Sequence, residues 1–194
     1  NCSTIQAMVP LKALDDKYKI KRVVYSTYQA VSGSGVKGVE DLEKGMNGNP
    51  TGFYPHQISY NCLPHIDSFT ENGYTKEEMK MVNETMKILD NYDLKITATT
   101  VRVPVKNGHS ESINVEFNNP FELDDLVKTL EEAPGVVVVD NPAKNEYPTA
   151  VEFDDRDEVF VGRIRRDFSV DNGVNLWVVA DNIRKGAATN AIQI

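Results

Sequence analysis

The run LKITATTVRVPV occupies residues 94–105, and the run SESINVEF occupies residues 110–117. Both runs are rich in residues that favour β-strands. Residues 106–109, KNGH, separate them, and the Asn-Gly pair marks a tight turn. The sequence therefore predicts two strands joined by a tight turn.

Further strands are predicted on both sides of this pair. Residues 159–165 and 174–180 form a second strand pair, separated by Asp171-Asn172-Gly173. Residues 20–28 are predicted to be a buried strand that runs into a flexible turn at 32–35, and residues 136–139 a short buried strand.

Helices are predicted between these strands. Thr75 and Glu78 form a capping-box pattern at the start of a helix over 76–89, and Asn119-Pro120 lead into a helix over 121–132. Residues 3–18 have helical spacing that Pro10 should kink or interrupt. Residues 45–56 are expected to form a loop, and residues 187–194 a helix.

This mixture of strand pairs and helices favours one domain over residues 1–194. We expect an α+β fold, with a mixed, largely antiparallel sheet and helices packed on one face. We expect no dinucleotide-binding half in this chain.

Composition narrows the classes of function. The chain has 194 residues and a net charge of −8, which argues against nucleic acid or an anionic membrane surface as a partner. Its two cysteines, Cys2 and Cys62, are too few for a disulfide scaffold and lack zinc-ligand spacing, so we expect no metal site and a reducing, cytoplasmic location.

A few residues are candidates for chemistry, each with a plain structural alternative. Cys2 precedes a predicted helix, whose positive end should lower the pKa of the thiol, unless Cys2 is simply a buried apolar side chain. His109 lies at a turn and could act as an acid or base, or be an exposed turn residue. Arg102 in an apolar strand needs an anionic partner, either a ligand or a salt bridge. Glu77 and Lys80, three apart on a helix, form an ordinary ion pair by themselves.

Together, the motifs of this chain resemble the aspartate-β-semialdehyde dehydrogenase family, in the form found in Gram-positive bacteria. The resemblance runs from the first residue to the last. Its six ordered motifs are NCSTIQ at 1–6, STYQAVSG at 26–33, EEMK at 77–80, VRVPVKNGHSE at 101–111, VGRIRRD at 161–167 and WVVADNIRKGAATNA at 177–191.

The resemblance implies a reaction and a set of catalytic residues. In that family a cysteine attacks the aldehyde of L-aspartate 4-semialdehyde, hydride passes to NADP⁺, and phosphate cleaves the thioester to 4-phospho-L-aspartate. Metabolism uses the reverse direction, toward lysine, methionine, threonine and diaminopimelate. By motif position Cys2 resembles the nucleophile, Gln29 the glutamine near the reacting centre and His109 the acid/base.

Binding roles follow from the same motifs. Arg102 resembles the arginine that grips the substrate's α-carboxylate, Glu77 would face the substrate ammonium, and Lys80 would help bind phosphate. Ser32, Gly33 and Asn182 match positions that touch the NADP cofactor.

The resemblance also implies a domain organisation and an assembly. Residues 1–194 correspond to a catalytic and dimerisation domain with the fold of the glyceraldehyde-3-phosphate dehydrogenase-like superfamily. The NADP-binding Rossmann domain that precedes it and the end of the C-terminal helix lie outside this chain. The expected partners are small-molecule substrates and a second copy, as a homodimer or a dimer of dimers.

Three other interpretations stay open from the residues. Cys2 and His109 could serve a stand-alone cysteine hydrolase or acyltransferase, or the chain could be a non-catalytic dimerisation module. A related thioester-forming family, N-acetyl-glutamyl-phosphate reductase or glyceraldehyde-3-phosphate dehydrogenase, is the third. The motifs at 101–110 and 77–80 argue against it.

Overall fold

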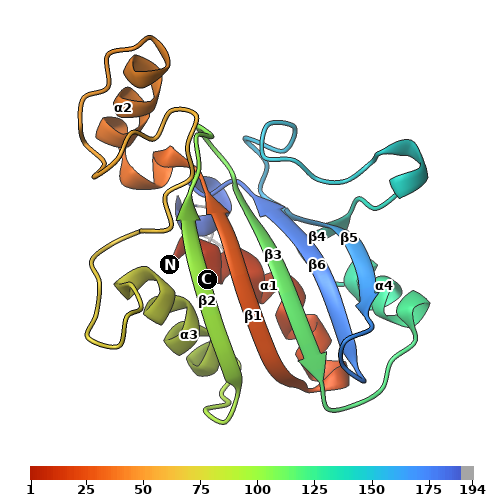
Figure 1. Ribbon diagram of the computed structural model, residues 1–194. Coiled ribbons are helices and arrows are strands. Elements are labelled where there is room, and N and C mark those ends of the chain that lie inside the picture. Colours follow the sequence, from red (N-terminus) through yellow and green to blue (C-terminus); the bar gives the residue numbers. More distant parts are fainter. Residues whose placement is uncertain (189–194) are drawn as a thin grey trace.

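The computed structural model describes residues 1–188 as one twisted sheet with helices packed against it (Figure 1). The sheet has six strands in the order β2-β1-β3-β6-β5-β4. The elements are α1 (Cys2–Tyr18), β1 (Ile20–Gln29), η1 (Val31–Ser34), α2 (Val36–Met46), α3 (Lys76–Ile88), β2 (Lys95–Arg102), β3 (His109–Phe117), α4 (Leu123–Glu131), β4 (Val136–Val138), η2 (Pro142–Lys144), β5 (Val159–Asp167), β6 (Gly173–Ala180) and η3 (Arg184–Ala188).

The sheet is mixed and mostly antiparallel, which confirms the predicted fold class. β1 pairs with β3, β3 with β6 and β6 with β5 in antiparallel fashion, whereas β1 with β2 and β5 with β4 are parallel. The predicted pair around Asp171-Asn172-Gly173 is an antiparallel hairpin, in which Asp167 lies opposite Gly173. The predicted strands over 20–28 and 136–139 are present as β1 and β4.

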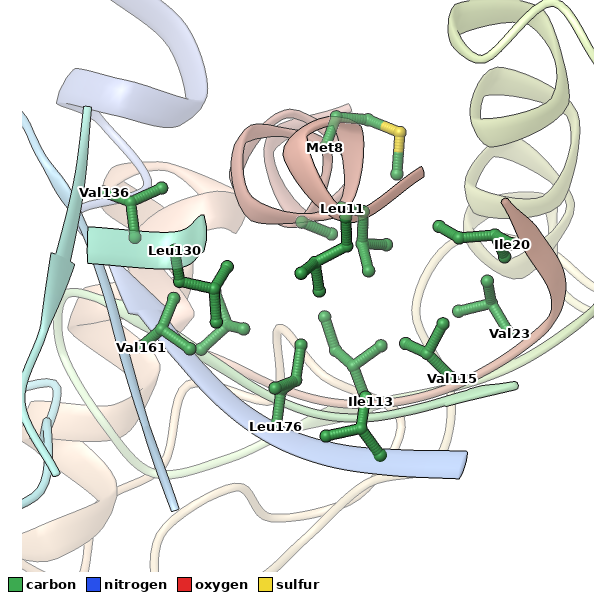
Figure 2. Close-up of a cluster of buried hydrophobic side chains, with 14 of the residues drawn as sticks. Met8, Leu11, Ile20, Val23, Ile113, Val115, Leu130, Val136, Val161 and Leu176 are labelled. Atoms are coloured by element: carbon green, nitrogen blue, oxygen red, sulfur yellow. The ribbon is translucent and has the colours of Figure 1, made fainter. Parts of the chain in front are cut away.

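Helix α1 lies across one face of the sheet and forms the core with it (Figure 2). The side chains of Leu11 and Leu14 are fully buried against apolar residues of the central strands, among them Ile113 and Leu176. Burial of apolar surface is the main favourable contribution to folding. The same packing of α1 on the sheet places Cys2, the first residue of α1, at the end of the sheet where β1 stops.

The tight turn predicted between β2 and β3 does not make them neighbours, because β1 lies between them. The segment after β2 follows the end of β1, where Val103 N–H donates to the Gln29 carbonyl and Val31 N–H to the Val105 carbonyl. Gly108, with φ of +83°, then turns the chain into β3 on the far side of β1. The hairpin prediction was therefore wrong, because buried β1 takes a strand on each side and a local turn motif does not encode that pairing.

Two predictions for the first 56 residues need correction. Pro10 does not interrupt the helix: α1 continues through Pro10, which is buried in the middle of it, because packing of the flanking turns outweighs the lost amide hydrogen bond. The predicted flexible turn at 32–35 instead forms the 3₁₀ helix η1, and helix α2 follows it without having been predicted.

Helix α2 is held by tertiary contacts. Leu42 packs in a small second cluster with Val31 and Ile58. The Asp41 carboxylate accepts from the backbone N–H groups of Gly52 (3.0 Å) and Tyr54 (3.3 Å), which ties the following loop to the helix. That loop corresponds to most of the region predicted at 45–56.

The helices with local sequence signals formed as predicted. α3 begins at the Thr75–Glu78 capping box, with Glu78 N–H to Thr75 Oγ1 at 3.2 Å and Thr75 N–H to Glu78 Oε2 at 2.8 Å. α4 forms within the predicted 121–132. The helix predicted at 187–194 lies almost entirely outside the described residues, which end with the π-helical turn η3. None of the helices within residues 1–188 is long and apolar enough to cross a membrane.

Candidate active site

The candidate residues meet at one end of the sheet. Gln29 and Arg102 are the last residues of the parallel neighbours β1 and β2 and lie side by side in the register. His109 is the first residue of β3 and lies opposite Ala180, the last residue of β6. The N-terminus of α1, with Cys2, lies over this end of the sheet (Figure 1). Strand pairing brings Gln29 beside Arg102, and helix α1 adds Cys2, which lies 107 positions before His109 in the sequence.

Cys2 and His109 are in direct contact, with 3.2 Å between Sγ and the ring Nε2. The backbone N–H of Ala30 donates to Nδ1 of the same ring at 3.0 Å. In the neutral imidazole one ring nitrogen accepts and the other carries the proton. The Ala30 amide therefore assigns the proton to Nε2, facing Sγ.

The electrostatics of this pair favour uncharged forms. Burial, and then the nearby Arg102 guanidinium, lower the pKa of His109 to about 3. Burial, and then the Glu77 carboxylate, raise the pKa of the Cys2 thiol. The prediction that the helix end lowers this pKa was therefore wrong. The side chain of Asn1 already accepts from the Ser3 and Thr4 amides, and the buried site disfavours a thiolate more strongly than the helix end stabilises it.

Gln29 connects the sheet to α3. Its Nε2 donates to Ser3 Oγ and to Glu77 Oε1, the latter at 3.2 Å. Glu77 Oε2 lies 3.5 Å from Lys80 Nζ, as their spacing on one helix predicts. Lys80 also pairs with Asp67 at 3.2 Å, a partner that the sequence did not indicate. This half of the site thus carries both an acidic and a basic side chain, and Lys80 remains half-exposed.

Arg102 is buried, with 6% of its surface exposed, and points into the site. One Nη1 hydrogen bond goes to the Ala30 carbonyl at 2.6 Å, and Nε has no hydrogen-bond partner. No carboxylate among residues 1–188 forms an ion pair with it. A buried guanidinium with unused donors is suited to bind an anionic ligand.

The three residues matched to the cofactor site lie beside His109. Ser32 Oγ and Asn182 form a side-chain hydrogen bond at 3.2 Å, and Asn182 Oδ1 also accepts from Gly108 N–H at 2.9 Å. A Cβ atom on Gly33 would lie 3.0 Å from Arg102 Nη1 and 3.4 Å from His109 Nε2. Glycine thus leaves this part of the site open, which fits the close approach of a flat ring such as nicotinamide.

No three metal-ligand side chains cluster together in the described part of the chain. Both cysteines have free thiols, and the second, Cys62, is exposed on the loop between α2 and α3.

The sequence analysis missed two buried polar residues next to the Cys2–His109 pair. Gln6 lies one helical turn after Cys2, and its Nε2 donates to the His109 carbonyl at 3.3 Å. Glu111 lies two positions after His109 on the same face of β3 and is fully buried. Burial raises the pKa of Glu111 well above its ordinary value, although the Gln6 side chain lowers it. A carboxylate in an otherwise apolar strand face was the signal that could have identified Glu111.

Glu111→Gln is expected to stabilise the protein at neutral and alkaline pH. The folded protein binds the Glu111 proton more tightly than the unfolded chain, so stability falls as pH rises above the ordinary glutamate pKa. Glutamine cannot ionise, so the variant does not lose stability in this way as pH rises. Urea unfolding at pH 5 and pH 8 should show a gain for Glu111→Gln that is larger at pH 8. Glu116→Gln, on the opposite face of β3, is the control, and an equal effect of Glu111→Gln at both pH values would contradict the assignment.

Comparison with known proteins shows the family of this chain. The profile of the family described as "Semialdehyde dehydrogenase, dimerisation domain" matches residues 11–185. An aspartate-semialdehyde dehydrogenase from Aquifex aeolicus is 55% identical over 201 residues, covering 100% of this chain and 59% of the relative. One from Legionella pneumophila is 53% identical, with 100% and 58% covered.

Solved structures give the same result. The crystal structure of aspartate semialdehyde dehydrogenase II from Vibrio cholerae superposes with a TM-score of 0.94 at 46% identity, covering 100% of this chain and 59% of that one. The same enzyme complexed with ASA superposes equally well. The chain spans somewhat under three-fifths of the length of these relatives. It belongs to the semialdehyde dehydrogenase family, as a dimerisation domain of that family.

Proposed function

We propose that this chain is the catalytic and dimerisation domain of an NADP-dependent aspartate-semialdehyde dehydrogenase. The enzyme would convert 4-phospho-L-aspartate to L-aspartate 4-semialdehyde by reductive dephosphorylation. The observation that carries the proposal is the contact between Cys2 and His109, inside a site that also holds a buried arginine with unused donors.

Cys2 forms and later releases the covalent bond to the substrate. Its Sγ attacks the acyl carbon of 4-phospho-aspartate and the bond from this carbon to the phosphate oxygen breaks. The thiol proton leaves with the phosphate, and a thioester remains. NADPH, when bound, supplies the hydride that reduces the thioester carbon. The C–S bond of the resulting hemithioacetal then breaks, which releases the aldehyde and restores the sulfur.

His109 assists at two atoms. Its Nε2–H donates to Sγ when the sulfur carries negative charge, and to the substrate oxygen on which charge develops after hydride addition. An imidazolium in this position would have to break the hydrogen bond to Ala30, because Nδ1 would then carry a proton that faces the amide proton. The acid/base role that the family resemblance gives to His109 thus starts from the Nε2–H tautomer.

The remaining residues bind and orient the substrate. Arg102 would hold the α-carboxylate, Glu77 the ammonium group, and Lys80 the phosphate, while Gln29 lies between Ser3 and Glu77 next to the reacting carbon. Ser32, Gly33 and Asn182 would receive the nicotinamide end of NADP. The anionic substrate is then bound by two placed cations, against the overall charge of −8.

Arg102→Lys in the full-length protein is expected to raise KM for the substrate about 10- to 100-fold, the range for loss of one charge-assisted hydrogen bond. Lysine keeps the charge but cannot bind a carboxylate with two parallel donors. kcat should fall much less. Arg156→Lys, which changes an exposed arginine paired with Glu158, is the matched control and should leave both constants unchanged. A fall in kcat alone, with KM unaltered, would contradict the carboxylate-binding role.

Residues 1–194 expressed alone are expected to form a dimer but to lack turnover, because they cover only 59% of the Aquifex aeolicus relative and most of the NADP site would lie in the remainder. We propose that the dimer forms through the face of the sheet opposite α1, where Tyr28 and Trp177 contact each other at 5.5 Å between ring centroids. Light scattering measures the mass, and NADP⁺ reduction with phosphate and semialdehyde measures the activity. Robust NADP⁺ reduction by residues 1–194 alone would contradict the expected lack of turnover. A monomeric mass would contradict the proposed dimer.

The same assay on the full-length protein tests the proposed activity. NADP-linked, phosphate-dependent oxidation of aspartate 4-semialdehyde supports it. Hydrolysis of thioesters or amides without nicotinamide would favour the cysteine hydrolase instead. Membership of the semialdehyde dehydrogenase family argues against the hydrolase.

A further inference from the structure

Gln6 bridges the two elements that carry the catalytic pair. It lies on α1 four residues after Cys2, so both side chains project from the same face of the helix. Its Nε2 donates to the backbone carbonyl of His109 at 3.3 Å, and its surface is fully buried. This bond joins the helix that holds Sγ to the strand residue that holds Nε2.

Glu111 lies on the other side of the Gln6 amide. It belongs to the face of β3 that also carries His109, and its register partner on β1 is Thr27, another fully buried polar residue. Neither carboxyl oxygen of Glu111 makes a well-aligned hydrogen bond to a described residue, and the same holds for Gln6 Oε1 and Thr27 Oγ1. Polar groups buried in this way are costly and usually have a specific role.

The direct chemistry of the site does not need either residue. Sγ faces His109 Nε2, whereas Gln6 contacts the backbone behind the ring. Gln6 therefore touches the residue that carries the ring without touching the ring nitrogens themselves.

We propose that Gln6 is a positioning residue that sets the separation of Cys2 Sγ and His109 Nε2. The role rests on the proposed function of the Cys2–His109 pair. Without Gln6 Nε2, α1 loses a buried hydrogen bond to the backbone of β3. Sγ can then move away from the Nε2–H donor.

Alkylation of Cys2 measures this role without any turnover. In the full-length protein, the rate of reaction with iodoacetamide is followed from pH 6 to 10 by mass spectrometry of the Cys2 peptide, with the exposed Cys62 as an internal reference. Gln6→Met keeps the volume but removes the donor. The rate of Cys2 alkylation in this variant should fall about fivefold, the factor for loss of one hydrogen bond. The pH profile of the reaction should shift to higher pH, because the Cys2 thiolate loses the His109 Nε2–H donor. Cys62 should react as before.

Gln6→Asn is the second variant, in case the apolar substitution prevents folding. The asparagine side chain is one methylene shorter, so its amide does not reach the His109 carbonyl. Gln6→Asn should therefore lower the rate of Cys2 alkylation as Gln6→Met does. Turnover should show a lower kcat for the slow variants, with KM unchanged.

Folded Gln6→Met and Gln6→Asn proteins that alkylate with the wild-type rate and profile would overturn the positioning role. Failure of the proposed function is a separate result, because it would appear as full activity in a protein that lacks the Cys2 thiol.

Discussion

Cys2→Ser should reduce NADP-linked turnover of the full-length protein by about three orders of magnitude or more, as expected for loss of a covalent nucleophile. A serine hydroxyl is far less acidic than a thiol, and burial in this site disfavours its anion further. His109 cannot compensate as a base, because Nδ1 is occupied by the Ala30 amide and Nε2 carries the proton. Initial rates with saturating substrate give the comparison.

The chain offers a matched control for this experiment. Cys62 is its only other cysteine and lies exposed on a loop. Cys62→Ser should keep the wild-type rate, and iodoacetamide should inactivate it as fast as it inactivates the wild type. If Cys2→Ser retained a tenth of the activity or more, Cys2 would not be the nucleophile and the proposed mechanism would have to be abandoned.

His109→Asn should lower kcat about 10²- to 10⁴-fold, the usual contribution of such a group. An asparagine amide can take the place of Nδ1 beside Ala30 but does not reach Sγ. His109→Gln can place an N–H donor near the position of Nε2, so it should be about tenfold more active than His109→Asn, the factor for one hydrogen bond of about 1.4 kcal/mol. Steady-state rates of the two variants at pH 8 test this difference.

The charge state of His109 can be measured directly. Burial and the Arg102 guanidinium lower its pKa to about 3, so the ring should stay neutral from pH 5 to 8, with its proton on Nε2. Nitrogen chemical shifts of the imidazole report both the tautomer and the protonation, and the spectrum of His109→Gln assigns the signal among the three histidines. Titration of His109 near pH 6.5, or equal activity of the two variants, would show that the ring works as an imidazolium acid.

Much of the secondary structure was predictable because its signals are local. The capping box at Thr75 and Glu78 starts α3 where the sequence indicates, and the β5–β6 hairpin forms around a turn with good turn residues. Helix α2 had no such signal, since it contains Gly38 and Gly45 and depends on contacts with residues that follow it in the chain. Its formation is a tertiary effect, and local propensity gave no means to predict it.

The sequence predicted which residues form the candidate site better than it predicted their electrostatics. The motifs indicated Cys2, His109 and Arg102, and the structure brings these three together. The direction of the thiol pKa was predicted wrongly, because a helix end was considered without the burial that opposes it. Gln6 and Glu111 were overlooked, since a buried polar residue stands out only when its surroundings are known.

The sequence by itself determined the family, the elements with strong local signals and the identity of the candidate catalytic residues. Only the tertiary structure decided that β1 lies between β2 and β3, and this pairing places Gln29, Arg102 and His109 at one end of the sheet. The physical reason is that strand order depends on which surfaces become buried together. Contacts between residues far apart in the chain set that burial, and the same contacts set the charge state of the catalytic pair.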